Sequence, residues 1–279
     1  MIAILGGLGA ALCFAASTLC SARSSRMIGS ASVVAWVMVI GLVVTLPLVA
    51  VAARPDLSGK APLWLVLSGL GNVCGLLVVY AAFRLERVGI VAPITSTEGA
   101  IAALIAGVAG EEIGGATGVA LAAVAIGVVL AGIVRGRGEE PHDHRGALLA
   151  LGSAGLFGVG LYATGRVGAD LPIAWAVLPA RLLGVLLVTL PLLVASRLRL
   201  TREAAPLVLC SGLAEVGGFA SYAIGARHGI AISAVLASQF AAISAVAAYF
   251  LFGERLAPVQ IAGAATIAVG VAALTALQG

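Results

Sequence analysis

The sequence is poor in charge. Only 10% of its 279 residues are Asp, Glu, Lys or Arg, against roughly 25% in an average soluble domain. Hydrophobic residues make up 61% of the chain, and the mean hydropathy is +1.15. No soluble fold of this size could keep so much apolar surface away from water. The loops between the apolar stretches are short, so the whole chain is predicted to be membrane domain.

The sequence also lacks clustered basic residues and metal-ligand motifs. Its net charge of +4 rests on 15 Arg and one Lys, which are scattered over the loops and do not form the basic face that nucleic-acid binding requires. His142 and His144 lie on a hydrophilic stretch that is too sparse in ligands for a selective metal site. We therefore expect no nucleic-acid partner, no metal and no cofactor. Four cysteines without ligand spacing are expected to be free thiols packed as small apolar side chains: Cys13, Cys20, Cys74 and Cys210.

Ten apolar stretches are long enough to cross a bilayer. A membrane helix needs about 20 predominantly apolar residues, because each residue adds about 1.5 Å along the axis of a helix that must cross about 30 Å. The stretches lie near residues 2–22, 31–53, 61–84, 88–110, 114–134, 146–166, 172–196, 205–226, 230–252 and 256–277.

A shift of 143 residues aligns the first half of the chain with the second. Ser68-Gly69-Leu70 matches Ser211-Gly212-Leu213, and Gly110-Glu111 matches Gly253-Glu254. Other pairs need smaller shifts, as where Ala35-Trp36 matches Ala174-Trp175 at 139. Internal similarity of this kind indicates a structural repeat.

The repeat predicts the architecture. Each half contains an odd number of spans, so the second half must enter the bilayer upside down relative to the first. The fold class is therefore predicted to be an all-α integral membrane protein with ten transmembrane helices arranged as two inverted five-helix repeats. The repeats are assigned to residues 1–134 and 146–279, and residues 135–145 form the hydrophilic linker.

Three charged residues lie near the middle of predicted spans. Glu98, Arg181 and Glu215 are each nine or ten residues into their helices, where a charge costs about 2.5 to 3.5 kcal/mol on insertion scales. Ser211 and Tyr222 share the helical face of Glu215, and that face is polar or small throughout. Such a stripe is expected to line a cavity and not to face lipid.

The repeat adds two polar residues to this group. Asn72 is the counterpart of Glu215 at the same depth, and Gln239 lies in the neighbourhood equivalent to Glu98. In an inverted fold these pairs face each other across the axis between the halves. We therefore predict a central substrate site formed by Asn72, Glu98, Arg181, Ser211, Glu215, Tyr222 and Gln239.

The charged residues allow two interpretations. Arg181 and Glu215 either grip the two charged ends of a substrate, or form a buried salt bridge that only locks two helices together. Glu98 has no predicted cation on its own helix face, and loss of water favours the protonated form of a carboxyl group. Glu98 is therefore the candidate proton carrier, the alternative being a hydrogen-bonded structural acid. Pro93, just before it, is expected to kink the helix.

The organisation resembles the EamA-type branch of the drug/metabolite transporter superfamily. The resemblance rests on two five-helix halves that each end in Gly-Glu followed by a Gly-rich helix, as in Gly110-Glu111 and Gly253-Glu254. It implies a multi-pass carrier of the bacterial inner membrane, often an exporter of amino acids or related metabolites. The second half has Ser233 where such a repeat often has the proline that Pro93 represents in the first half.

These features favour a secondary transporter that exports a small polar metabolite, most simply an amino acid, by alternating access. One alternative is proton-coupled efflux of cationic or aromatic drugs. A more remote alternative is a membrane enzyme or scaffold, which no intramembrane pair of catalytic residues supports. The expected partners are a small-molecule substrate, the lipid bilayer and protons, and the chain is expected to be a monomer or a weak homodimer.

Orientation is left open by two conflicting indications. Loops after odd-numbered spans carry 11 Arg, whereas those after even-numbered spans carry four basic residues. The positive-inside rule therefore places the termini outside. The resemblance implies termini in the cytoplasm.

Overall fold

The computed structural model describes residues 1–85, 91, 94–132, 144–240, 242–244, 247 and 258–278. Within these ranges the regular structure is helical, without a strand. Pro93, Gly253-Glu254 and most of the linker, including His142, lie outside the described residues. The elements are α1 (Ile2–Ile28), α2 (Ser30–Val51), α3 (Ala61–Leu85), α5 (Glu98–Val108), α6 (Gly115–Gly132), α7 (His144–Asp170), α8 (Ile173–Gly184), η1 (Val185–Thr189), α9 (Leu190–Val194), α10 (Ala205–Ala226), α11 (Ile230–Ala237) and α13 (Pro258–Gln278).

Six helical stretches are long and apolar enough to cross a membrane by length and composition. They are Ile2–Ile28, Ser30–Val51, Ala61–Ala82, Arg145–Ala169, Ile173–Val194 and Ala205–Ala226, and each coincides with a span expected from the sequence. The other expected spans contain the described helices α5, α6, α11 and α13. Apolar side chains such as Leu5, Val43 and Val194 cover the outer surface, as lipid contact requires. The chain is a multi-pass membrane protein.

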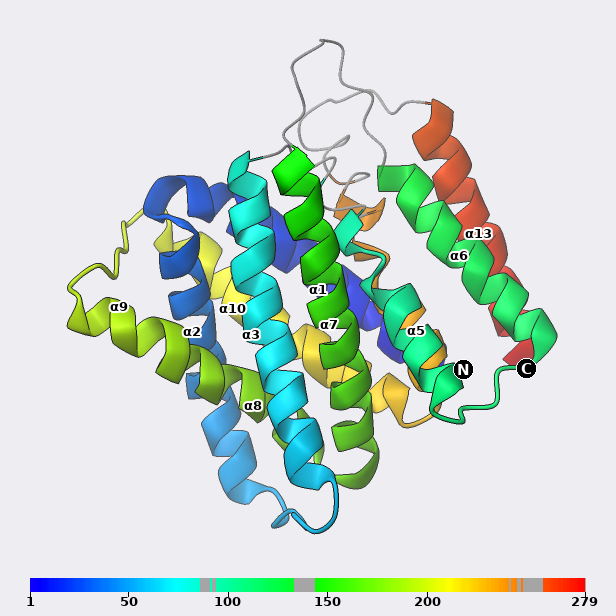
Figure 1. The fold of residues 1–279 in the computed structure, drawn as a ribbon, viewed down its shortest axis with the longest axis horizontal. Coiled ribbons are helices and arrows are strands. Elements are labelled where there is room, and N and C mark those ends of the chain that lie inside the picture. Colours follow the sequence, from blue (N-terminus) through cyan, green and yellow to red (C-terminus); the bar gives the residue numbers. More distant parts are fainter. Residues whose placement is uncertain are drawn as a thin grey trace.

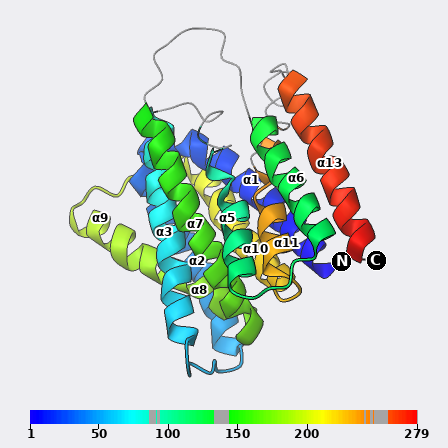
Figure 2. The same cartoon turned by 45° about the vertical axis from the view of Figure 1, so that its right-hand side comes forward.

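The helices form one bundle with both termini at the same end (Figure 1). α6 and α13 lie side by side at one edge of the bundle (Figure 2). α1 rises from the terminal end and α7 descends towards it, while α3 rises and α10 descends (Figure 1). The helices that correspond in sequence therefore run in opposite directions. A reverse turn at Gly29, with φ of 85°, joins α1 to α2 at the opposite end.

Contacts between helices recur at the shift of 143 residues. Ser21 on α1 shares a 2.6 Å hydrogen bond with Ser211 on α10. The residues 143 positions away are Thr164 on α7 and Ser68 on α3, and they also share a hydrogen bond of 2.6 Å. The contact between α1 and α10 thus corresponds, at a shift of 143 residues, to the contact between α7 and α3.

Close packing against glycine follows the same exchange. A Cβ on Gly218 would lie 2.5 Å from the Phe14 ring, and a Cβ on Gly75 would lie 2.6 Å from the Phe157 ring. Such distances leave no room for a side chain, so the glycines admit the phenylalanines. The paired α6 and α13 repeat the pattern, with Gly127 against Ile267.

The contacts between α2 and α8 also repeat at a shift of 143 residues. Gly41 packs against Arg181, and Gly184 packs against Met38; the shift of 143 interchanges these contacts. The shift of 139 that matches Trp36 with Trp175 therefore does not describe the contacts in the middle of these helices.

Candidate functional site

A cavity of about 60 Å³ lies where α1, α3, α5, α7 and α10 meet. This volume admits several water molecules, since one needs roughly 10 to 15 Å³ of this measure and polar partners. Three of the charged or amide residues expected at the site line it: Asn72, Glu98 and Glu215. The remaining lining is four hydroxyl residues, aromatic rings, aliphatic side chains and a glycine: Ser17, Thr18, Tyr80, Thr95, Phe14, Phe157, Phe219, Phe240, Leu76, Val79, Leu161 and Gly160.

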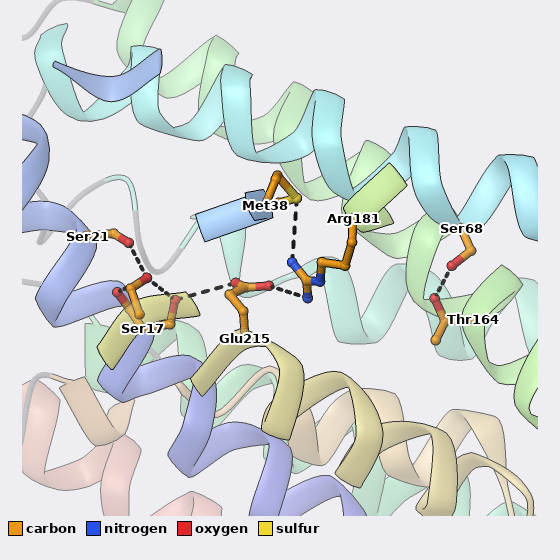
Figure 3. A network of polar contacts seen from close by, with 8 residues as sticks. Ser17, Ser21, Met38, Ser68, Thr164, Arg181 and Glu215 are labelled. Atoms are coloured by element: carbon orange, nitrogen blue, oxygen red, sulfur yellow. Dashed lines mark hydrogen bonds and ion pairs between the residues drawn. The ribbon is translucent and has the colours of Figure 1, made fainter. Parts of the chain in front are cut away.

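Arg181 does not line the cavity but lies behind Glu215. The two side chains form an ion pair with a distance of 3.3 Å between Nη2 of Arg181 and Oε2 of Glu215. Arg181 is fully buried, its Nη1 points at the sulfur of Met38 at 3.6 Å, and its guanidinium lies 5.5 Å from the centroid of the Phe219 ring. Figure 3 shows the contacts of Arg181 with Glu215 and with Met38. Glu215 thus neutralises the cation, and Met38 and Phe219 shield it from water.

A chain of serine hydroxyls supports the other oxygen of Glu215. Ser17 donates to Oε1 of Glu215 at 3.5 Å. Ser17 and Ser21, one turn apart on α1, both hydrogen-bond the Ser211 hydroxyl, at 2.9 and 2.6 Å (Figure 3). The Tyr80 hydroxyl lies within hydrogen-bonding reach of Ser21. The chain ties α1, α3 and α10 together around one carboxylate.

Glu98 lies on the cavity wall without a cation. Its side chain is 6% exposed, and no residue in the described part of the chain gives its carboxyl group a hydrogen bond or an ion pair. It stands at the first residue of α5, where the positive end of the helix favours an anion. Gly99 lets this turn approach α11 closely, because a Cβ there would lie 2.4 Å from the Ala234 carbonyl oxygen. Glu98 thus lines the small cavity from a turn that packs closely on α11.

Asn72 contributes an acceptor without a donor. Its Oδ1 is buried and has no hydrogen-bond partner, although the side chain lines the cavity and is only 3% exposed. A buried, unpaired carbonyl costs about 1 to 3 kcal/mol. That cost is removed when a water molecule or a ligand N–H fills the cavity.

The other expected site residues lie outside the cavity lining. Ser211 belongs to the serine chain, and the Tyr222 hydroxyl donates to the Leu161 carbonyl oxygen at 2.8 Å. Gln239 is buried, and its Nε2 has no partner. The structure therefore brings Asn72, Glu98 and Glu215 together around one space, and it sets Arg181, Ser211 and Tyr222 behind that wall.

Sequence reasoning missed the contribution of α1. Ser17 and Thr18 line the cavity, and Phe14 packs beside them against Phe219 with ring centroids 5.2 Å apart. The available signal was the spacing of Ser17, Ser21 and Ser24 by four and three residues, which marks one polar face on an otherwise apolar helix.

Residues 1–133 match the EamA-like transporter family. The first half of this chain is an EamA-like domain. We therefore place the protein in the EamA-type branch of the drug/metabolite transporter superfamily. A crystal structure of a protein matches the fold with a TM-score of 0.78, covering 99% of this chain and 96% of that chain at 20% sequence identity. That likeness shows the fold alone. No curated protein matches the sequence significantly.

In the described residues, no group of three or more His, Cys, Asp or Glu side chains is placed to hold a metal ion. The thiols of Cys13, Cys20, Cys74 and Cys210 are free.

Proposed function

We propose that this EamA-type protein is a secondary transporter of the bacterial inner membrane that moves a small polar metabolite by alternating access. The transporter family matched by residues 1–133 supports this. So do the contacts that interchange between the halves, such as Ser21–Ser211 with Thr164–Ser68. We propose that these contacts reflect two inverted five-helix repeats, with the substrate bound on the axis between them.

The observation that carries the proposal is the shared cavity of Asn72, Glu98 and Glu215. Two carboxyl groups and an unpaired amide oxygen offer acceptors, and the aromatic rings of the wall offer faces that attract cations. The nearest guanidinium, that of Arg181, is already paired with Glu215. We therefore propose a cargo with an amine group and an apolar or aromatic body. Glu98 exchanges its proton for that amine, which couples transport to protons.

The second candidate cargo is an amino acid, and the position of Arg181 favours it. The guanidinium contacts Glu215 and Phe219, and both of these residues line the cavity. Protonation of Glu215 weakens the pair and makes Arg181 available to a substrate carboxylate. An amine without a carboxylate needs no such step.

The two cargoes are separated by transport into proteoliposomes at fixed pH. The assay compares radiolabelled amino acids with their decarboxylated amines and with a quaternary ammonium dye, under an imposed proton gradient. Gradient-dependent movement of the amines and the dye supports the first candidate, and movement of amino acids alone supports the second. If no compound moves faster than in vesicles that carry Glu98→Gln and Glu215→Gln together, the proposed function is wrong.

A further inference from the structure

Tyr222 on α10 forms a hydrogen bond with the main chain of α7 beside the cavity. Among the described residues that line or adjoin the cavity, it makes the one such bond between these two helices. Its hydroxyl donates to the Leu161 carbonyl oxygen at 2.8 Å, and the side chain is 0% exposed. Leu161 lines the cavity, and so does Phe219, one turn before Tyr222. Tyr222 lies seven residues after Glu215, about 10 Å farther along α10. α10 runs towards the end of the bundle that holds both termini (Figure 1), so Tyr222 lies nearer that end than Glu215 does.

The positions equivalent to this contact, 143 residues earlier, lie on α3 and α1. Tyr222 corresponds to Val79 on α3, and Leu161 corresponds to Thr18 on α1. Val79 lies seven residues after Asn72, as Tyr222 lies seven after Glu215. Both Val79 and Thr18 line the cavity. The Tyr222–Leu161 pair is thus joined by a hydrogen bond, whereas both members of the corresponding pair, Val79 and Thr18, line the cavity.

From this difference we infer that Tyr222 is the gate that closes the cavity towards the terminal end. Thr18 and Val79 form its counterpart, which closes the opposite end when Tyr222 releases Leu161. The inference rests on the proposed alternating access and assigns its gate. In an inverted repeat each half adopts the other's conformation when access switches, so a contact made on one side is exchanged for its equivalent on the other.

A hydrogen bond distinguishes the pair of Tyr222 and Leu161 from its counterpart. The Tyr222 hydroxyl donates to a main-chain carbonyl oxygen that would otherwise lack a second donor. Closing this side therefore gains a directional hydrogen bond. Val79 has no hydroxyl, so the corresponding pair of Val79 and Thr18 cannot form the equivalent hydrogen bond. The Tyr222–Leu161 bond therefore stabilises closure at the terminal end by one hydrogen bond.

Hydrogen–deuterium exchange of the full chain in nanodiscs tests the gate without a substrate. Tyr222→Phe removes the hydroxyl and keeps the ring. Deuterium uptake is expected to rise at the C-terminal ends of α7 and α10, and to fall in the second half of α1 and the end of α3. One hydrogen bond corresponds to a shift in population of about three- to tenfold. Tyr162→Phe is the matched control, since Tyr162 is a buried tyrosine of α7 that packs on Trp64.

Val79→Tyr is the reciprocal variant, because it places a tyrosine at the position that corresponds to Tyr222. It is expected to shift uptake in the same direction as Tyr222→Phe. If Tyr222→Phe raises uptake only around its own turn, without the fall in α1 and α3, Tyr222 is a packing residue and the inference is wrong. The pattern of exchange does not depend on transport. If uptake rises in α7 and α10 and falls in α1 and α3, but no compound is transported by proteoliposomes, the proposed function is wrong and the inference about Tyr222 still holds.

Discussion

Arg181 and Glu215 form a 3.3 Å ion pair whose two members both belong to the second half of the chain. The residues 143 positions earlier are Met38 and Asn72, which are neutral. Arg181 also contacts Met38, its own counterpart, at 3.6 Å. The charge of the site therefore breaks the symmetry of the packing, and one half carries an ion pair where the other carries a thioether and an amide.

The ion pair predicts opposite results for single and double substitutions. Arg181→Met or Glu215→Asn alone leaves one buried charge without a partner, and is expected to cost about 3 to 5 kcal/mol and to lower the melting temperature. Arg181→Met with Glu215→Asn copies the neutral first half and is expected to recover most of that loss. Thermal unfolding in detergent measures both. A double variant as unstable as the worse single variant would contradict the pairing.

The same double variant separates stability from transport. It lacks the Glu215 carboxylate on the cavity wall, so transport is expected to stay lost when stability returns. Recovery of both would show that the pair serves only to hold α8 against α10.

Glu98 predicts the pH dependence of ligand binding. The groups that face it are Glu215 and, behind that, Arg181, and within the described residues Glu98 has no cation of its own. A carboxyl group that binds an amine must first lose its proton, so proton and ligand compete. Affinity for an amine is expected to rise with pH until Glu98 is ionised, and Glu98→Gln is expected to abolish this rise. Titration calorimetry at several pH values tests it, and an unchanged pH profile in Glu98→Gln would remove the residue from coupling.

Asn72 predicts a gain in stability at the cost of binding. Asn72→Leu keeps a similar volume and removes the buried Oδ1 that has no partner. Thermal stability is expected to stay equal or to rise by about 1 to 3 kcal/mol, because the penalty for that atom disappears. Ligand affinity is expected to fall about tenfold or more, since a hydrogen bond to a charged group is worth about 1.5 to 3 kcal/mol. A fall in stability without loss of binding would give Asn72 a structural role.

Gly71 and Gly155 predict where the bundle tolerates a methyl group. A Cβ on Gly71 would lie 2.6 Å from the Gly160 Cα, whereas a Cβ on Gly155 would meet nothing within 4 Å. Gly71→Ala is therefore expected to cost about 1 to 3 kcal/mol by overpacking α3 against α7. Gly155→Ala is expected to be neutral or to stabilise its helix by up to about 1 kcal/mol. Unfolding of the two variants side by side measures the difference, and equal stability would contradict the close approach.

Much of the fold was readable because the bilayer imposes a simple rule on the chain. Apolar stretches such as 61–84 and 205–226 coincide with α3 and α10, since every main-chain group in lipid must be bonded within its own helix. Counting residues along a helix predicted similar depths for Glu98, Arg181 and Glu215. For Glu98 the assumption of a continuous helix was wrong, because a turn at Ser96 and Thr97 precedes it and α5 begins at Glu98. Direction around the helix was harder to predict. Arg181 lies at the depth of the cavity, yet Glu215, Met38 and Phe219 cover it.

The sequence alone determined that this protein is a bundle of membrane helices with a polar centre, because hydropathy and residue count act locally along the chain. It also carried the residue matches at a shift of 143, which are visible without coordinates. The tertiary structure decided which polar groups line the same cavity and which form hydrogen bonds or ion pairs with one another. Packing between helices that are far apart in sequence, as of Ser17 against Ser211 or Tyr222 against Leu161, sets those distances, and no local pattern encodes them.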